Sequence, residues 1–137
     1  MSTEHKKKGF VVDLETETIA NKDFRRVLYT AKNLQLVVMS LPPKEEIGEE
    51  VHHLDQFIRI DEGEAQFVLN GNPVNAKDGY AVVVPAGTRH NVINTSATSA
   101  LKLYTVYGPP DHLDGTVHHT KADVPEDEPE FDGKTTE

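Results

Sequence analysis

Four side chains in this sequence could together hold a metal ion. Glu50 and His52 stand two residues apart, Gln56 follows four residues later, and His90 lies in a separate part of the chain. Because side chains alternate along a strand, Glu50 and His52 would point to one face of an extended segment, which Gln56 would rejoin if the chain stays extended. A carboxylate oxygen, an amide oxygen and imidazole nitrogens suit a hard or borderline divalent ion. These four residues are therefore the candidate metal ligands.

The sequence lacks the residues of the common alternatives to a metal site. It has no cysteine, which excludes thiolate catalysis, a disulfide framework and a cysteine-type zinc site. It also has no G-x-S-x-G nucleophile motif, no phosphate-binding glycine loop and no G-x-G-x-x-G motif after a strand. Any chemistry that this chain performs is therefore expected to come from the metal.

The local structure around His90 can be predicted from residues 78–96. Residues 81–84 form a β-branched apolar run of strand length, closed by a proline that cannot donate to a sheet. Proline and glycine within residues 85–88 then favour a turn. Residues 89–94 follow as a second strand, and His90 lies near its start.

The residues around His90 match the second signature motif of the cupin superfamily, G-x5-P-x-G-x2-H-x3-N. Its five fixed positions are occupied here by Gly79, Pro85, Gly87, His90 and Asn94. The first cupin motif, G-x5-H-x-H-x3-4-E-x6-G, is matched in part by residues 48–63 when its last glycine is placed at Gly63. Glu50 then takes the position of the first histidine, His52 that of the second and Gln56 that of the glutamate, while the opening glycine is out of place.

Over residues 34–107, the chain thus resembles a small single-domain cupin of the cupin 2 conserved barrel family. The resemblance implies an all-β fold, a double-stranded β-helix or jelly-roll barrel of the RmlC-like type. It also implies a divalent metal ion (Fe, Mn, Ni or Zn) held by His52 and His90, with Gln56 and Glu50 at the positions of the other two ligands. His53 has the opposite parity to His52 and is expected to point outward into solvent.

Apolar patterning along the whole chain predicts short strands and no helix. Short apolar runs at residues 10–12 and 24–29 indicate strands, with exchange between subunits as one interpretation. In residues 33–41 both alternating sets are largely apolar, which places this strand between two buried layers or at a subunit contact. Residues 64–69, which end in an Asn-Gly hairpin turn, and residues 99–107 alternate more clearly. Short strands separated by turns favour an all-β sandwich or barrel.

Length and composition predict one domain with polar extensions. At 137 residues the chain can form one core but not two independent ones. We expect a flexible N-terminal tail at residues 1–9, the barrel at 10–110 and a C-terminal extension at 111–137. Acids and prolines dominate residues 122–137, which are therefore predicted to be disordered. Residues 109–121 could instead fold back across the mouth of the barrel.

Charge and hydropathy limit the partners. With 14 Lys and Arg against 23 Asp and Glu the net charge is −9, and no basic stripe is present, so neither nucleic acid nor an anionic membrane surface is expected. No apolar run approaches the ~18 residues of a membrane span, and no apolar core follows the N-terminal lysines, which indicates a cytoplasmic protein. The apolar residues 33–41 and the outward parity of Phe57 predict a homodimer.

Three functions remain open from the sequence. The first is a metal-dependent enzyme, a dioxygenase or an isomerase, that acts on a small polar molecule by oxygenation, isomerisation or lyase chemistry. A sugar-phosphate isomerase of the cupin type is a variant of it, although no basic cluster for a phosphate is present. The second is a non-catalytic module that binds a metal or a small ligand, and the third is a storage or structural barrel. The first is preferred, with no catalytic residue assigned beyond the metal ligands.

Overall fold

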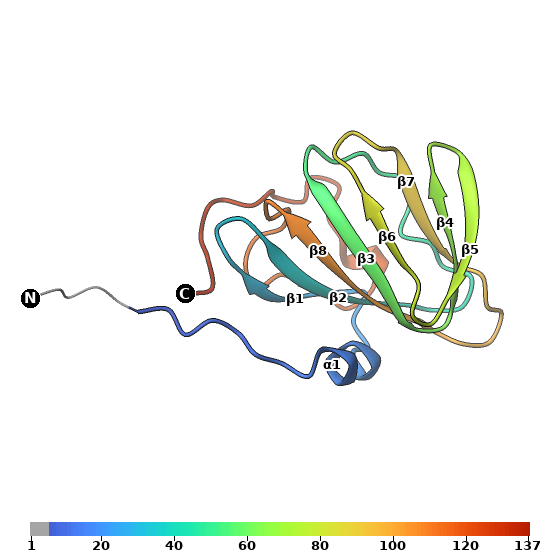
Figure 1. The fold of residues 1–137 in the computed structure, drawn as a ribbon, viewed down its shortest axis with the longest axis horizontal. Helices are drawn as coiled ribbons and strands as arrows, with labels where there is room; N and C mark the ends of the chain where they lie inside the picture. The colour runs from blue at the N-terminus through green and yellow to red at the C-terminus, as the bar shows by residue number, and fades with distance from the viewer. Residues whose placement is uncertain (1–5) are drawn as a thin grey trace, which may run out of the picture.

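In the computed structural model, which describes residues 6–137, two antiparallel β-sheets face each other (Figure 1). The larger sheet has the strand order β6-β3-β8-β2-β1-β9 and the smaller sheet the order β5-β4-β7. The strands are β1 (Arg25–Thr30), β2 (Gln35–Leu41), β3 (Asp55–Glu62), β4 (Glu64–Leu69), β5 (Asn72–Lys77), β6 (Ala81–Val84), β7 (His90–Asn94), β8 (Leu101–Gly108) and β9 (Val117–His118). The prediction of an all-β jelly-roll fold is confirmed.

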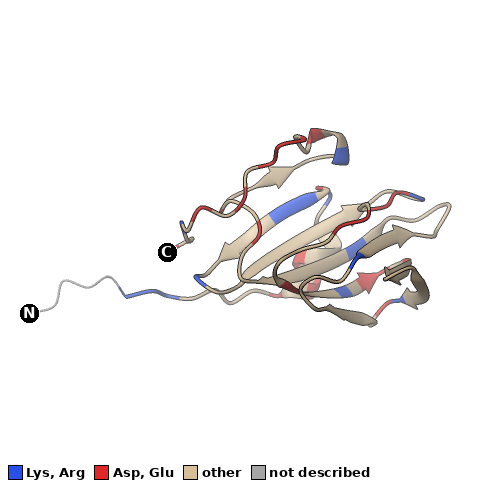
Figure 2. Cartoon of the chain, turned by 90° about the horizontal axis from the view of Figure 1, so that it is seen from above, with Lys and Arg blue, Asp and Glu red and all other residues tan. Residues whose placement is uncertain are grey.

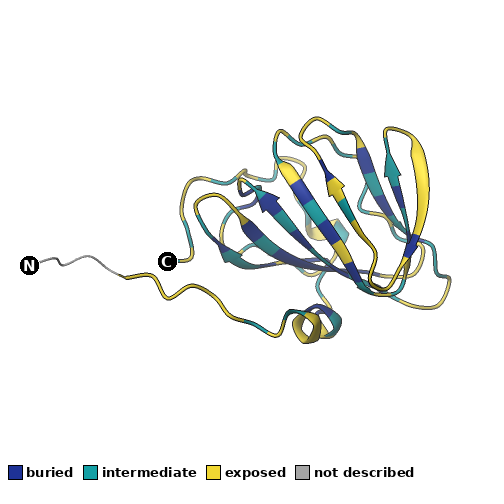
Figure 3. Cartoon of the chain, in the orientation of Figure 1, coloured by how far each residue is buried: buried dark blue, intermediate teal, exposed yellow. Residues whose placement is uncertain are grey.

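Strand β8 lies inside the larger sheet and shows how its two faces differ. Its residues alternate between buried and partly exposed along the whole strand (Figure 3). Leu103 pairs with Met39 of β2 on one side and with Ile60 of β3 on the other, and all three are at most 1% exposed. These side chains share one buried cluster with Phe67 of the smaller sheet. Because burying each large apolar side chain contributes about 1.5–3 kcal/mol, this inner layer holds the two sheets together.

Two glycines shape the connections between neighbouring strands. Asn70 and Gly71 join β4 to β5 with φ of 49° and 81°, the positive values that a two-residue hairpin turn requires, which confirms the predicted turn. Gly63 lies between β3 and β4 with φ 118°, and a Cβ at this position would lie 3.1 Å from the carbonyl oxygen of Ala100. A side chain would therefore be strained here and would press on the neighbouring main chain.

Most predicted strands are confirmed within two residues of their ends. The expected strands at 24–29, 33–41, 81–84, 89–94 and 99–107 correspond to β1, β2, β6, β7 and β8. The expected strand at 10–12 is wrong: Phe10 stacks on Tyr29 with 5.4 Å between ring centroids, and Val11 is fully exposed. Since β2 and β9 already occupy the two sides of β1, no edge of β1 is left for this segment to join.

A short helix packs on the outer face of the larger sheet, although the sequence predicted none. Helix α1 (Leu14–Ala20) begins at Asp13, whose carboxylate accepts a hydrogen bond from the Thr16 N–H at 3.2 Å. Thr18 is fully buried, and Val38 of β2, which lies beside α1, is 1% exposed. The helix thus explains the apolar outer face of β2 without a subunit contact. Within residues 6–137 no helix is long and apolar enough to cross a membrane.

The C-terminal extension, residues 111–137, runs back along the larger sheet (Figure 1), whereas disorder was predicted for its acidic part. Strand β9 pairs with β1, and a short 3-10 helix (Lys121–Asp123) follows it. Near the end, the Thr30 N–H donates to the Thr136 hydroxyl at 2.8 Å, and the Thr136 N–H donates to the Thr30 carbonyl at 2.9 Å. Acidic side chains occur along the extension (Figure 2). Polar contacts therefore hold this segment where apolar residues are too few.

The two ends of the described chain meet beside β1. The Glu137 carboxylate accepts hydrogen bonds from the Lys8 and Gly9 N–H groups at 2.6 and 2.8 Å. The Tyr29 hydroxyl donates to the same carboxylate, and the Tyr29 ring stacks on Phe10. Of the predicted N-terminal tail, residues 1–5 lie outside the described residues, and the following segment contacts the end of the C-terminal extension.

Candidate metal centre

Glu50, His52 and His90 come together between the start of β7 and the loop that precedes β3. One potential ligand atom from each of the three lies within 4.8 Å of the others. Glu50 and His90 form an antiparallel bridge in which each N–H donates to the other's carbonyl at 2.9 Å. His52 follows two residues later, and its carbonyl accepts a hydrogen bond from the Gly87 N–H at 2.8 Å. Main-chain hydrogen bonds therefore join the two motifs that the sequence singled out.

The strand expected through Glu50 and His52 is not formed. Glu50 makes an isolated bridge, and β3 begins only at Asp55. The Asp55 carboxylate accepts a hydrogen bond from the Ala86 N–H at 2.9 Å. The loop is thus held to the turn before β7 by single contacts and not by a continuous ladder, although Glu50 and His52 still reach one site.

His90 is held in one orientation by its own strand. Its Nδ1 lies 2.9 Å from the Thr88 carbonyl oxygen, which can only accept, so Nδ1 carries the proton. This tautomer leaves the lone pair of Nε2 free to bind a cation. The His90 residue is 5% exposed, and its ring centroid lies 5.2 Å from that of His52. The second motif therefore supplies an oriented imidazole.

Among residues 6–137, two buried polar atoms of the candidate ligands have no hydrogen-bond partner. One is Nε2 of His52, whose nearest carboxylate oxygen, on Glu50, lies 3.7 Å away, beyond hydrogen-bond range. The other is Oε1 of Gln56, a buried side chain whose Nε2 donates to the Thr105 hydroxyl at 3.0 Å. An unpaired buried polar atom costs about 1–3 kcal/mol, and each of these atoms has a lone pair that a cation could accept. The donor set therefore fits a divalent ion.

Gln56 joins this group through its place in the larger sheet. It stands opposite Tyr107 of β8 and opposite Val84 of β6. The Tyr107 ring lies edge-on to the His52 ring, with 6.0 Å between centroids. Gln56 therefore lies beside a residue that contacts His52, and His53 is exposed as expected.

Sequence reasoning missed Tyr107 and His112, which stand next to the candidate ligands. The Tyr107 ring contacts that of His112 at 5.2 Å between centroids, and its hydroxyl lies 3.4 Å from His112 Nε2. Burial raises the pKa of Tyr107 far above its ordinary value, so the phenol stays neutral at physiological pH. The alternation along β8 could have identified Tyr107, because it lies two residues after Thr105 and therefore points to the same, buried face of the sheet.

His112 belongs to a buried polar network that ties the C-terminal extension to the larger sheet. Its Nδ1 lies 2.6 Å from Glu128 Oε2, and Glu128 Oε1 lies 3.6 Å from Nη1 of the buried Arg25. The His112 N–H donates to Gln35 Oε1 at 3.0 Å. Burial acts to raise the pKa of Glu128, but the hydrogen bond from His112 and the charges of His112 and Arg25 outweigh it, and the pKa is lowered. Through Tyr107, this network reaches the ring of His52.

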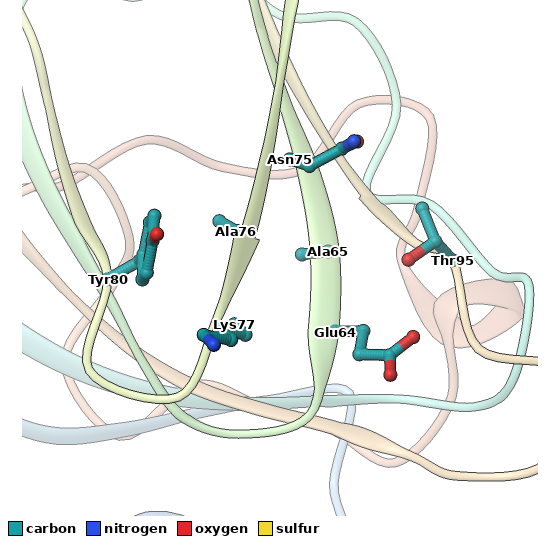
Figure 4. Close-up of a pocket in the computed structure, with 7 residues that line it drawn as sticks. All are labelled: Glu64, Ala65, Asn75, Ala76, Lys77, Tyr80 and Thr95. Carbon is teal, nitrogen blue, oxygen red and sulfur yellow. The ribbon is translucent and has the colours of Figure 1, made fainter.

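A cavity of about 270 Å³ lies beside His52, with walls from residues 51–54, 109–111 and 130–131. A hollow of about 510 Å³ lies elsewhere, at β4, β5 and the turn before β6 (Figure 4). The second hollow contains none of the four candidate ligands and no imidazole. Its Glu64 and Lys77 pair in register across β4 and β5. The smaller cavity is therefore the candidate approach to the metal centre.

Comparison with known proteins gives the same family for the sequence and for the fold. Residues 37–107 match the sequence model of the cupin domain. The uncharacterized protein YrkC of Bacillus subtilis is 47% identical over 124 residues, 85% of this chain and 66% of YrkC. An uncharacterized protein of Acanthamoeba polyphaga mimivirus is 46% identical over 113 residues, 79% of this chain and 70% of that protein. The crystal structure of BH2720 from Bacillus halodurans has a TM-score of 0.83 and 45% identity, over 89% of this chain and 97% of that chain.

The share of each relative's length that matches this chain differs. The match spans 66% of the length of YrkC, whereas it spans nearly all of BH2720. The family match ends at residue 107, before the residues that form the cavity wall at 109–111 and 130–131.

Proposed function

This chain belongs to the cupin family, and from that premise we propose that it binds a divalent metal ion through Glu50, His52, Gln56 and His90 and acts as a metal-dependent enzyme on a small molecule. The observation that carries the proposal is the cluster of Glu50, His52 and an oriented His90, whose potential ligand atoms lie within 4.8 Å of one another, together with the atoms of His52 and Gln56 that have no partner among the described residues. Each of these atoms has a lone pair, and each costs free energy as long as it has no partner.

The protein's own residues prepare this site in three ways. The Thr88 carbonyl fixes the tautomer of His90, and the Thr105 hydroxyl fixes the amide of Gln56, which orients both ligands. Glu50 supplies the single negative charge of the set. A divalent ion bound here would supply Lewis-acid or redox chemistry to a molecule in the adjoining cavity. Iron, manganese, nickel and zinc all suit this mixed oxygen and nitrogen set, and oxygenation, isomerisation and lyase chemistry are the reactions that we propose.

A non-catalytic module that binds a metal or a small ligand is the second candidate. It is favoured by the small size of the cavity, about 270 Å³, which is below the roughly 300–1,000 Å³ of sites that take a drug-sized molecule. A sugar-phosphate isomerase is less well supported, because no Lys or Arg lines this cavity. Turnover of any small molecule by the metal-loaded protein would favour the enzyme, and binding without turnover would favour the module.

Metal binding is the first test. We would determine the metal content of protein purified without a histidine tag, and then titrate Mn²⁺, Ni²⁺ and Zn²⁺ into metal-free protein by calorimetry. His90→Ala should lose the most affinity and His52→Ala nearly as much, because imidazole nitrogens are the strongest donors of the set. Gln56→Ala should lose the least. Glu50→Gln keeps the shape but removes the anionic ligand, so Mn²⁺ binding should fall before Zn²⁺ binding.

His53→Ala is the matched control, because this exposed imidazole lies next to His52 in sequence and outside the ligand cluster. It should bind metal like wild type. Equal affinity of His90→Ala and wild type would show that the motif has only a structural role here, and the enzyme proposal would fail with it.

A further inference from the structure

We infer that the C-terminal extension helps to select what reaches His52, and that it favours neutral or positively charged molecules with a small apolar ring over organic anions. The inference rests on the proposed function in one respect, namely that His52 belongs to the metal centre. The selecting residues are Glu130 and Phe131, which lie outside the part of the chain that matches the cupin domain.

The cavity wall that these two residues form is attached at several points. The Phe131 N–H donates to the Asp111 carbonyl at 3.1 Å, and Glu130 makes an isolated bridge with His112. Two residues before Glu130, the Glu128 carboxylate contacts His112 at 2.6 Å. The wall is therefore built into the fold, as expected for a ligand pocket that is largely formed before binding.

The charges that line the cavity are all of one sign. Its ionised side chains are Asp111 and Glu130, and none of its lining residues is a Lys or an Arg. Arg25, which lies 3.6 Å from Glu128, is buried and does not line the cavity. In metal-free protein an organic anion in the cavity would face two carboxylates, of which that of Asp111 also lies 3.3 Å from His112 Nε2, whereas an ammonium group would be attracted to both. His52 and His53 are the only other titratable groups in the lining.

The remaining lining is apolar and small. Val51 and Leu54 come from the loop before β3, Pro109 and Pro110 follow β8, and Phe131 comes from the C-terminal extension. A cavity of about 150 Å³ can hold benzene, so about 270 Å³ accommodates one ring with a short polar arm. Ring and charge together define the class of molecule: a small aromatic or alicyclic amine or alcohol.

Lysines gather at a different place. A hollow of about 420 Å³ is lined by Lys22, Lys102 and Lys121, and Lys102 lies at the opposite end of β8 from Tyr107. An anion that binds this protein can therefore bind there without entering the cavity at His52. The test must assign each binding event to its cavity.

The experiment compares three probes of one shape, benzylamine, benzyl alcohol and benzoate, titrated into metal-free protein and followed by NMR and calorimetry. Metal-free protein is used because benzoate could otherwise bind the ion directly. We expect benzylamine to bind about threefold or more tighter than benzyl alcohol, and benzoate about threefold or more weaker, through the charges of the lining. Phe131→Ala should weaken binding of both the amine and the alcohol, because it removes the apolar wall.

Glu130→Lys takes the lining from two negative charges to one of each sign, so it should remove most of the difference in affinity between benzylamine and benzoate. Glu126→Lys makes the same charge change on the extension away from the cavity and should leave the difference unchanged. Benzoate that binds to wild type as tightly as benzylamine and is weakened by Phe131→Ala would overturn the inference. Equal effects of the two lysine variants would also overturn it. Neither result bears on the metal, because both come from metal-free protein and metal binding is tested separately by His90→Ala, so failure here is distinct from failure of the metal proposal.

Discussion

The Glu128→Gln variant tests whether the C-terminal extension is held as the structure shows. The substitution keeps the shape of the side chain and removes its charge. In wild type, Glu128 Oε2 lies 2.6 Å from His112 Nδ1 and Oε1 lies 3.6 Å from Arg25, which is 5% exposed. Hydrogen bonds to charged groups contribute about 1.5–3 kcal/mol. Because the Glu128 side chain keeps 21% of its exposure, we expect a loss in the lower part of that range, about 2 kcal/mol.

This loss can be expressed as a change in melting temperature. Unfolding entropy is about 2.1 cal/mol/K per residue, so the 137-residue chain has about 0.29 kcal/mol/K. A loss of about 2 kcal/mol then lowers the melting temperature by about 7 °C. Thermal melting followed by circular dichroism at pH 7 would measure it. Glu126→Gln is the matched control, because Glu126 is exposed and belongs to the same acidic segment.

The difference in stability between wild type and Glu128→Gln should become smaller as the pH falls. The pKa of Glu128 is lowered in the folded protein, from an ordinary value of 4.5, because His112 and Arg25 outweigh the effect of burial. A lowered pKa contributes stability that is fully present above the unfolded value and is lost as the pH falls through the folded value. Wild type and Glu128→Gln should therefore differ most above about pH 5 and converge as the pH falls well below 4.5. If Glu128→Gln melted like Glu126→Gln at pH 7, and its Phe131 amide exchanged no faster, this network would not hold the extension.

Three further predictions concern the metal, the helix and the outer sheet face. Metal at 100 times its Kd should raise the melting temperature by about 9 °C, because metal binding adds about 2.7 kcal/mol to the free energy of unfolding. In scanning fluorimetry, His90→Ala should abolish this shift and His53→Ala should keep it. Burial raises the pKa of Asp61, opposed by Thr18 and Arg59, so Asp61→Asn should stabilise the protein by about 1 kcal/mol at pH 7. This gain in stability should vanish as the pH falls toward 3.8, where the Asp61 carboxyl becomes protonated. Equal melting temperatures of wild type and Asp61→Asn at pH 7 would contradict the prediction. Light scattering should give the mass of a dimer for wild type and of a monomer for Val83→Lys. Val83 is 65% exposed and pairs with Phe57 across β6 and β3, so a lysine there would place a charge in an apolar contact on the outer face. A monomer mass for wild type at micromolar concentration would refute this.

The strands could be predicted because their signals are local. The run at 81–84 ends at a proline, and the alternation along 99–107 persists as alternating burial in β8. The candidate ligands could be proposed for a similar reason, since short motifs contain both histidines. The structure adds the Glu50–His90 bridge, which joins residues forty positions apart and lies beyond the reach of periodicity.

The features that could not be predicted depend on contacts between distant or polar residues. Helix α1 buries only Thr18 fully among its seven residues, so it carries no apolar period that the sequence could reveal. The extension is held by polar contacts of its own Glu128 and His112, and Glu128 also faces Arg25 at the start of β1. Composition alone predicts disorder for such a segment, because it measures apolar content and not whether each charge finds a partner.

The contact of Glu137 with Lys8 and Gly9 makes the chain a candidate for circular permutation. A short linker could join residue 137 to residue 8, and the chain could be opened at the exposed turn of Asn70 and Gly71 between β4 and β5. In the permuted chain, the pairing of β4 with β5 would become the most distant in sequence, while the contacts between the former ends would become local. The native contacts would be the same and only their order along the chain would differ. Comparing the folding rates of the two forms would therefore separate the influence of connectivity from that of the contacts themselves.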